Sequence, residues 1–243
     1  TCWKERETRE VMEAVSLYRL LRPVFSAGEL RLDLTLRSGQ AFRWKPIQCP
    51  DCALGVSVYG WDPHKQGYAL EPVCGLLQDE VFECAFLGVL GQRLIQVVQS
   101  SHDVLFWCKE LEEEEEEEKK IHARVQPPRT QAQAVRPQLL DYFWLREDGS
   151  MDLQDMYALW SAADPMHFAH IAPVFPGVRL LRQDPFECLF SFICSSNNNI
   201  KRIALMLDKL CAALGNPVPV PASRPAISLQ GHPIQCMYSF PTP

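Results

Sequence analysis

The sequence lacks a long apolar run, and no stretch approaches the roughly 18 apolar residues with which a helix crosses a bilayer. It also lacks the apolar core and small-residue cleavage site of a secretory signal peptide. Glycine is scarce beside proline, with 12 residues against 19 and no collagen repeat. These absences argue against an integral membrane protein and a fibrous protein. The remaining composition, 47% hydrophobic and 22% charged over 243 residues, is that of one large or two small globular domains.

Net charge is −6, and one segment produces it. Glu110 and the run 112–118 supply eight acidic residues, and Lys119 and Lys120 follow. Without these ten residues the chain carries 22 basic and 22 acidic residues. Such a block of like charges is typical of a solvated segment. The overall charge therefore neither favours nor excludes a polyanionic partner.

Ten cysteines occur at irregular spacing, which favours a reduced, intracellular protein over a disulfide framework. Three lie in apolar helical patterns, where a thiol acts as a small hydrophobic side chain: Cys188, Cys194 and Cys211. Cys49 and Cys52 form a C-x-x-C pair, but Cys74 and Cys84 are too widely spaced to complete an ordinary structural zinc site. No metal site is predicted.

Alternating apolar and polar residues predict a strand over 29–37. Its apolar positions are four leucines, Leu30, Leu32, Leu34 and Leu36. Ser38-Gly39 would then turn the chain into a partner strand over 40–44. Three further strands are expected at 87–90, 94–98 and 104–107, the first two joined by a turn at Gly91-Gln92. Together they indicate an antiparallel meander, with insertions at about 45–83 and 110–136.

Beyond residue 136 the pattern becomes helical. Leu139, Leu140 and Phe143 share one face of a helix, and Asp152 is placed to cap the next. Asp164-Pro165 predicts the start of a short helix through His170. His167 and His170 would share a face of that helix, but core or surface histidines are the better interpretation than a metal site.

A polar corner between two apolar helices is the most informative segment. Asp184-Pro185-Phe186-Glu187 resembles a capping box and opens a buried helix. Five small polar residues, 195–199, interrupt the apolar pattern, which resumes at Ile200 and ends at Gly215 as a C′ residue. A helix N-terminus with nearby cations is a seat for a phosphate or a base edge. Asparagines that merely cap a helix are the simpler alternative.

Two separated blocks of sequence resemble the eukaryotic 8-oxoguanine DNA glycosylases. The first is Leu32-Asp33-Leu34 together with Ser38-Gly39-Gln40-Ala41-Phe42-Arg43-Trp44. The second is nearly continuous from Gly177 to Gly215 and includes Gly177-Val178-Arg179-Leu180-Leu181-Arg182-Gln183-Asp184-Pro185 and the run 191–200. Residues 45–83 and the glutamate run are outside the resemblance.

The resemblance implies a fold and a chemistry. The expected class is α+β, with an N-terminal antiparallel β-sheet domain (TBP-like) followed by the start of an all-helical glycosylase domain of the helix-hairpin-helix superfamily. In domain terms we expect an N-terminal segment (1–28), the sheet domain (29–145), a partial helical domain (146–215) and a Pro-rich divergent tail (216–243). The family flips oxidised guanine out of duplex DNA and cleaves its glycosidic bond. Its lysine forms a Schiff base that leads to strand scission, supported by an aspartate, without metal or organic cofactor.

The resemblance also implies roles for matching residues. Gly39 matches the glycine whose backbone carbonyl accepts a hydrogen bond from the lesion's N7–H, a proton that normal guanine lacks. Asn197 matches the asparagine that fills the vacated stack and touches the widowed cytosine, and Arg202 matches the arginine that hydrogen-bonds that cytosine. Asn198, Asn199 and Lys201 lie in the same corner, where the two asparagines are expected to cap. The expected partner is duplex DNA with 8-oxoguanine opposite cytosine, bound by a monomer in the nucleus, with mitochondria as a second location.

The segment after Gly215 departs from the family. The family's catalytic lysine lies in a glycine-rich hairpin, whereas here Gly231 is the one later glycine and no lysine follows. No catalytic residue is therefore assigned. We expect a chain truncated before the catalytic hairpin, without glycosylase or lyase activity and with exposed apolar helix faces. The alternatives are a catalytically dead damaged-DNA-binding or regulatory isoform and, more remotely, a zinc- or partner-binding module around Cys49 and Cys52.

Overall fold

The computed structural model of the chain describes residues 16–20, 28–48, 57–62, 67–70, 82–100, 104–109, 131–146, 152–222 and 224–241. The helices are α2 (Leu32–Thr35), α3 (Gln131–Tyr142), α4 (Leu153–Ala163), α5 (Phe168–Ile171), α6 (Pro185–Ser195) and α7 (Ile200–Leu214). The strands are β1 (Ser16–Arg19), β2 (Lys45–Ile47), β3 (Ser57–Asp62), β4 (Gly67–Leu70), β5 (Phe82–Leu90), β6 (Arg93–Ser100), β7 (Val104–Cys108), β8 (Pro217–Pro219), β9 (Ala226–Ile227), β10 (Pro233–Ile234) and β11 (Cys236–Tyr238).

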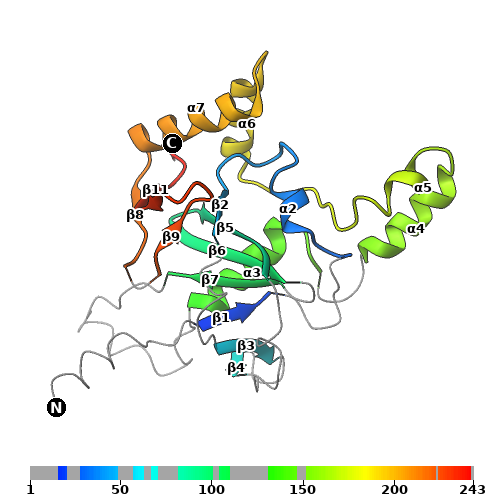
Figure 1. Cartoon of the computed structure of the whole chain (residues 1–243), viewed down its shortest axis with the longest axis horizontal. Coiled ribbons are helices and arrows are strands. Elements are labelled where there is room, and N and C mark those ends of the chain that lie inside the picture. Colours follow the sequence, from blue (N-terminus) through cyan, green and yellow to red (C-terminus); the bar gives the residue numbers. More distant parts are fainter. Residues whose placement is uncertain are drawn as a thin grey trace.

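A β-sheet forms the centre, with α3 packed on one face and the C-terminal strands on the other (Figure 1). The helix pairs α4–α5 and α6–α7 stand apart from each other beyond the sheet (Figure 1). Among the described helices, none has the length and apolarity of a membrane span. The expected α+β class, a sheet domain followed by helices, is confirmed.

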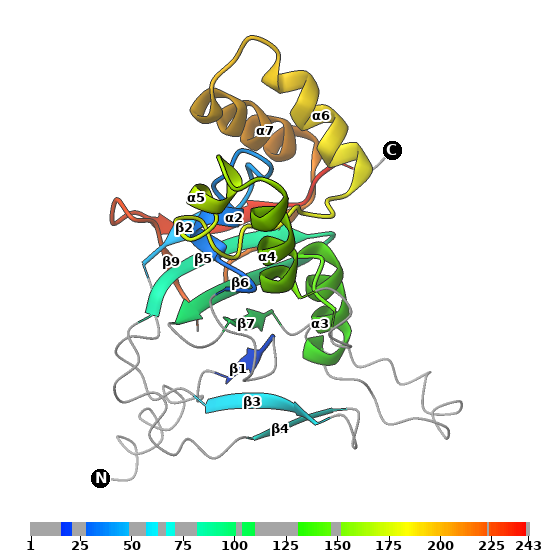
Figure 2. The ribbon, with the colours of Figure 1, turned by 90° about the vertical axis from the view of Figure 1, so that its right-hand side faces the viewer.

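The sheet has the strand order β2-β5-β6-β7-β1-β3-β4, visible as a stack in Figure 2. Neighbouring strands are antiparallel except β1 and β3, which run parallel. The β5–β6 hairpin turns at Gly91-Gln92, where Gly91 has a left-handed φ of 59°. Strand β7 then pairs with β6 in the register Val97↔Phe106. The meander predicted over 87–107 is confirmed.

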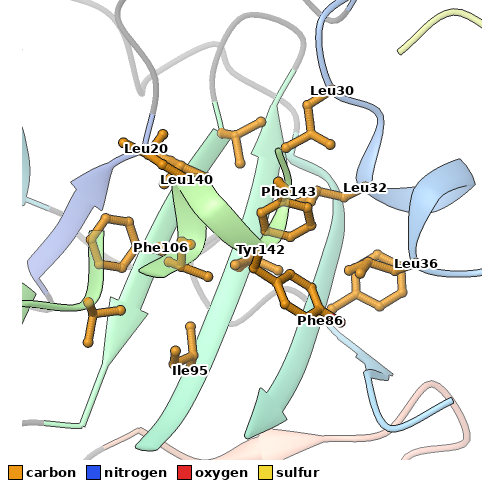
Figure 3. Packing of buried hydrophobic residues seen from close by; sticks show 14 of the residues in the cluster. Leu20, Leu30, Leu32, Leu36, Phe86, Ile95, Phe106, Leu140, Tyr142 and Phe143 are labelled. Carbon is orange, nitrogen blue, oxygen red and sulfur yellow. The ribbon is translucent and has the colours of Figure 1, made fainter. Parts of the chain in front are cut away.

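Both faces of the central strands are buried, in two separate clusters. Along β6, Ile95 and Val97 belong to the cluster that α3 covers, whereas Leu94 and Val98 belong to the cluster beneath the C-terminal strands. This division follows from the period-two geometry of a strand. Figure 3 shows the α3-side cluster, in which side chains from the sheet meet α3 and the segment 30–36.

The strand predicted over 29–37 is wrong, because the chain there forms the short helix α2 and flanking turns. Its leucines are nevertheless in the core, since Leu30 and Leu32 are fully buried in the α3-side cluster. A side chain satisfies the backbone in place of a neighbouring strand. Gln99 of β6 accepts a hydrogen bond from Leu32 N (2.7 Å) and donates one to Leu30 O (2.9 Å). This partner is 67 residues away, so local alternation misled the prediction.

The partner strand predicted over 40–44 is also wrong, because these residues are irregular and β2 begins at Lys45. Trp44 is buried under α3, and its indole N–H donates to Tyr142 Oη (2.9 Å). Burial of the Tyr142 phenol raises its pKa above the ordinary value. The segment therefore gains its order from tertiary contacts and not from a strand ladder.

The described parts of the two predicted insertions belong to the fold. Strands β2, β3 and β4 fall within 45–83, and the β3–β4 hairpin extends the sheet beyond β1. Helix α3 begins within 110–136, at Gln131. The remainder of both insertions, including the glutamate run, lies outside the described residues.

Local signals placed most helix starts correctly. Leu139, Leu140 and Phe143, predicted to share one helix face, are buried in the same cluster, although Phe143 follows the last residue of α3. Asp152 caps α4 by accepting from Gln154 N (2.9 Å). Helix α5 begins later than predicted, at Phe168. The Asp164 carboxylate accepts from the backbone N–H groups of His167 and Phe168, which makes 165–167 a turn.

The Pro-rich segment after α7 forms a second β layer against the sheet. In its described part β8 pairs with β11 and β9 with β10, both antiparallel. Val218, Ala226 and Met237 are buried against the sheet. Arg224 Nε donates to Gln96 Oε1 (2.6 Å), and its guanidinium lies 5.4 Å from the Trp107 ring centroid. The segment therefore contributes to the core.

Gly215 ends α7 as predicted but with an extended backbone, φ −90°, and not the left-handed conformation of a C′ glycine. A Cβ at this position would lie 2.0 Å from the Ser239 carbonyl oxygen. The glycine is therefore required because the C-terminal strands approach the end of the helix, where Ser239 N donates to Asn216 O (2.9 Å).

Candidate nucleic-acid interface

The structure brings Gly39 to the N-terminus of α7, across 160 residues of sequence. Gly39 adopts a left-handed φ of 87°, and a Cβ there would lie 3.9 Å from Ile200 Cδ1. The two residues share an open hollow on the surface, lined by Gly39, Phe42, Ser195, Asn198, Asn199, Ile200, Lys201 and Ile203. Four of the six residues assigned from the sequence thus line one hollow.

The polar corner 195–199 gives each of its asparagines a different role. Asn199 caps α7, with its Oδ1 accepting from Arg202 N (3.0 Å). Asn198 ties the corner together, because its amide donates to Cys194 O (3.0 Å) and its Oδ1 accepts from Asn199 N (3.0 Å). The expected capping role is thus confirmed for Asn199, and Asn198 braces the turn.

Asn197 occupies the tip of the corner. Its φ of 50° is left-handed, a conformation that asparagine tolerates better than most residues. Its side chain is exposed. The side chains of Asn198 and Asn199 are therefore used in hydrogen bonds within the corner, whereas that of Asn197 faces solvent.

Electrostatics at the corner favour an anion. Lys201 and Arg202 are exposed in the first turn of α7, which contains no acidic residue. The N-terminus of a helix carries a partial positive charge and unsatisfied N–H groups. A backbone phosphate or the acceptor edge of a base fits this arrangement.

A buried ion pair joins α6 to the loop between α2 and β2, which carries Gly39 and is called the Gly39 loop below. Arg43 donates to Glu187 Oε2 (2.7 Å) and to Tyr238 O (2.5 Å), and its guanidinium lies 5.7 Å from the Phe240 ring centroid. Burial raises the pKa of Glu187, while the Arg43 charge opposes that rise. Glu187 thus binds Arg43, whereas the predicted capping box would direct it to its own helix N-terminus. Asp184 supplies the cap, accepting from the N–H groups of Phe186 and Glu187.

A second buried ion pair, Glu29 with Arg179, lies beside the same loop, since Arg179 O accepts a hydrogen bond from Gln40. Arg179 donates to the Glu29 carboxylate (2.5 Å) and to Trp144 O (2.8 Å). The same carboxylate accepts from Leu153 N (3.0 Å) at the start of α4. Burial raises the pKa of Glu29 and lowers that of Arg179. Sequence reasoning missed this pair, because its members are 150 residues apart and no local pattern links one to the other.

The residues considered for metal binding do not form a cluster in the described part of the chain. His167 Nδ1 lies 3.2 Å from Asp164 Oδ1, at an exposed turn. No group of three or more His, Cys, Asp or Glu side chains is arranged as a metal site among the described residues. Cys49, Cys52 and Cys74 of the zinc alternative lie outside them.

Residues 23–189 match the family model of the 8-oxoguanine DNA glycosylase N-terminal domain. The chain is 29% identical over 181 residues to the N-glycosylase/DNA lyase OGG1 of Arabidopsis thaliana, covering 74% of this chain and 34% of that protein. It is 42% identical over 84 residues to the N-glycosylase/DNA lyase of Saccharomyces cerevisiae, covering 34% of this chain and 20% of that protein.

Solved structures share the fold. MBOgg1, in complex with a low-affinity DNA ligand, superposes with a TM-score of 0.53 at 21% identity, over 92% of this chain and 50% of that one. The 8-oxoguanine glycosylase/lyase of Clostridium acetobutylicum, bound to double-stranded DNA with cytosine opposite 8-oxoguanine, gives 0.50 at 20% identity, over 88% and 48%. The chain thus spans about half the length of these neighbours. Because the family model matches more than half of the chain, this protein belongs to the 8-oxoguanine DNA glycosylase family.

Proposed function

We propose that this chain acts in DNA base-excision repair by recognising 8-oxoguanine opposite cytosine in duplex DNA, as part of an N-glycosylase/DNA lyase. The observation that carries the proposal is the juxtaposition of Gly39 with the N-terminus of α7 in one open hollow. The substrate named for the solved relative, DNA with cytosine opposite 8-oxoguanine, supports it. Since the substrate is genomic DNA, we place the protein in the nucleus, with mitochondria as a second location.

The chemistry of discrimination follows from one proton. In guanine N7 is a hydrogen-bond acceptor, whereas in 8-oxoguanine N7 carries a hydrogen and is a donor. A backbone carbonyl at Gly39 would accept that hydrogen from the lesion and would face a lone pair in the normal base. An unpaired polar group in a desolvated site costs enough to separate two otherwise similar ligands. The left-handed backbone at Gly39 lets a main-chain group, without a side chain, approach the base.

The exposed side chains would read the opposite strand. Asn197 is at the tip of the corner, where it can enter the space left by an extruded base. Arg202 follows it on the first turn of α7 and would donate to the acceptor edge of the unpaired cytosine. Lys201 would bind a phosphate and contribute affinity without sequence information.

The test is equilibrium binding of the 243-residue chain to three labelled duplexes, containing 8-oxoguanine–cytosine, guanine–cytosine and 8-oxoguanine–adenine pairs. We expect the first to bind about tenfold more tightly than the second. Arg202→Gln should abolish the preference for cytosine over adenine opposite the lesion. Arg182→Gln is the matched control, because Arg182 is exposed and its side chain pairs, within the described part of the chain, with Asp141 at the surface. Equal affinity of the chain for damaged and intact duplexes would contradict the proposal.

A second candidate is lesion binding without turnover by this polypeptide. It is favoured by the segment that follows Gly215, which pairs into the short strands β8 to β11 against the sheet in the place where the resemblance implies a glycine-rich hairpin. Borohydride reduction traps a Schiff base between a lysine and the sugar. We expect no trapped adduct between the 243-residue chain and a damaged duplex, and a covalent adduct would establish a nucleophile elsewhere in the chain.

A further inference from the structure

The loop that carries Gly39 is hydrogen-bonded to residues 177–183, the segment that leads into α6, and Gln40 lies at the centre of this contact. Its side-chain N–H donates to Arg179 O (2.7 Å), and its Oε1 accepts from Leu181 N (2.9 Å). One side chain thereby makes the pair of bonds that a neighbouring strand would make with its backbone. Gln183 Nε2 returns a third bond, to Gln40 O (2.5 Å).

The segment 177–183, to which Gln40 is hydrogen-bonded, is itself held in place by other contacts. The Arg179 side chain is buried and hydrogen-bonded to Glu29 and Trp144. Its backbone N–H donates to Thr35 Oγ1 (3.3 Å), a contact that does not involve Gln40. Gln40 therefore connects the loop to a rigid part of the fold, from which the chain continues directly into α6.

The geometry matters because Gly39 is the neighbour of Gln40. A glycine backbone is soft, and its conformation is set by what holds the flanking residues. On one side Gly39 lies against Ile200 of α7. On the other side the chain is fixed by the hydrogen bonds of the Gln40 side chain to Arg179 O and Leu181 N, called the Gln40 clamp below. A hydrogen bond to a base weakens steeply as the acceptor moves out of line or out of range. Discrimination between 8-oxoguanine and guanine by the Gly39 carbonyl thus requires that the loop keep a fixed position.

We propose that Gln40 is the positioning residue of the Gly39 loop, holding it at the distance from α7 at which the loop selects the oxidised base. The inference rests on the proposed function of Gly39 and goes beyond it, because it assigns lesion selectivity in part to a side chain that acts through its neighbour. Affinity for DNA as such comes from the corner at α7, so loss of the clamp should reduce selectivity more than affinity.

The experiment compares the full chain with Gln40→Met, which keeps the length of the side chain and removes its hydrogen bonds to Arg179 O and Leu181 N, together with the one that its Nε2 donates to Ser38 Oγ (3.0 Å) within the loop. Gln48→Met is the matched control, because Gln48 follows β2 and has an exposed side chain. Two quantities are measured: the ratio of dissociation constants for guanine–cytosine and 8-oxoguanine–cytosine duplexes, and hydrogen exchange at the Leu181 amide. The Arg179 amide serves as the internal reference.

For Gln40→Met we expect the ratio to fall about fivefold or more, as for the loss of one or two hydrogen bonds, with faster exchange at Leu181 and unchanged exchange at Arg179. An unchanged ratio would overturn the inference. If Gln40→Met fails to fold, Gln183→Met, which removes only the bond to Gln40 O, should give the same pattern in weaker form, and an unchanged ratio there would be equally decisive. A wild-type chain without lesion preference would defeat the proposed function and, with it, the role in selectivity. Exchange at Leu181 would in that case still report whether the clamp exists.

Discussion

Individual glycines in this protein serve different physical purposes, and substitution separates them. A Cβ on Gly88 would lie 2.5 Å from the Trp44 ring, whereas one on Gly91 would meet nothing within 4 Å and is opposed only by a φ of 59°. We expect Gly88→Ala to lower the free energy of unfolding by about 1–3 kcal/mol through overpacking. Gly91→Ala should lower the free energy of unfolding by about 1–2 kcal/mol. Gly91→Asn should lower it less, because asparagine tolerates the left-handed region. Denaturant titration distinguishes them, and equal costs for the two Gly91 variants would contradict the conformational explanation.

Glu187 gives the molecule a pH dependence whose sign is set by burial. Its pKa in the folded state is raised mainly by desolvation, above the ordinary value of 4.5 that the unfolded chain retains. Between these two values the folded state binds more protons, so stability falls as pH rises. We expect the difference in unfolding free energy between the wild-type chain and Glu187→Gln to decrease from pH 4 upward through the raised pKa. Urea titrations at half-unit pH steps measure it, and an increase over that window would show that Arg43 outweighs burial.

At the scale of the element, the corner between α6 and α7 depends on a single cap. Asn199→Ala removes the acceptor for Arg202 N and should destabilise the chain by about 1 kcal/mol, while Asn199→Ser should retain most of the stability. Asn197→Gly, two residues earlier, keeps the left-handed backbone and removes no capping bond, so it should change the free energy of unfolding far less. The same titrations test both, and equal losses at 197 and 199 would mean that the corner has no dominant cap.

The elements also show where sequence patterns suffice. Asp152, Asp184 and Asn199 were identified as caps because a cap and the amide it satisfies lie within three residues of each other. The segment 29–44 was predicted incorrectly because its backbone is satisfied by Gln99 and its shape by Trp44 packing on Tyr142, partners far along the chain. The candidate site divides in the same way. The roles of Gly39 and the polar corner came from family resemblance, whereas those of Gln40 and the Glu29–Arg179 pair came only from the fold.

On the scale of the whole molecule, the helices α4 to α7 leave large apolar side chains exposed, as expected from the sequence. Phe192 is 72% and Leu189 53% exposed on α6. Large apolar side chains exposed in this number on one helix promote association. We expect the chain to bind a hydrophobic dye and to self-associate with rising concentration, and Leu189→Glu/Phe192→Glu to reduce both. Leu229→Glu, at a leucine of similar exposure in the turn between β9 and β10, is the control in sedimentation measurements, and an equal effect there would argue against α6 as the surface responsible.

The layer formed by β8 to β11 is synthesised after the sheet that it covers. The sheet face that carries Leu87, Val98 and Leu105 is covered by residues as late as Met237. At the synthesis rate of about 5–20 residues per second, more than 100 residues separate Leu105 from its cover, so the ribosome exposes that face for roughly ten seconds. A nascent chain in that interval presents a bare apolar sheet to the surrounding solvent. Chaperone capture, and not the final fold, would then limit how much of this protein a cell accumulates.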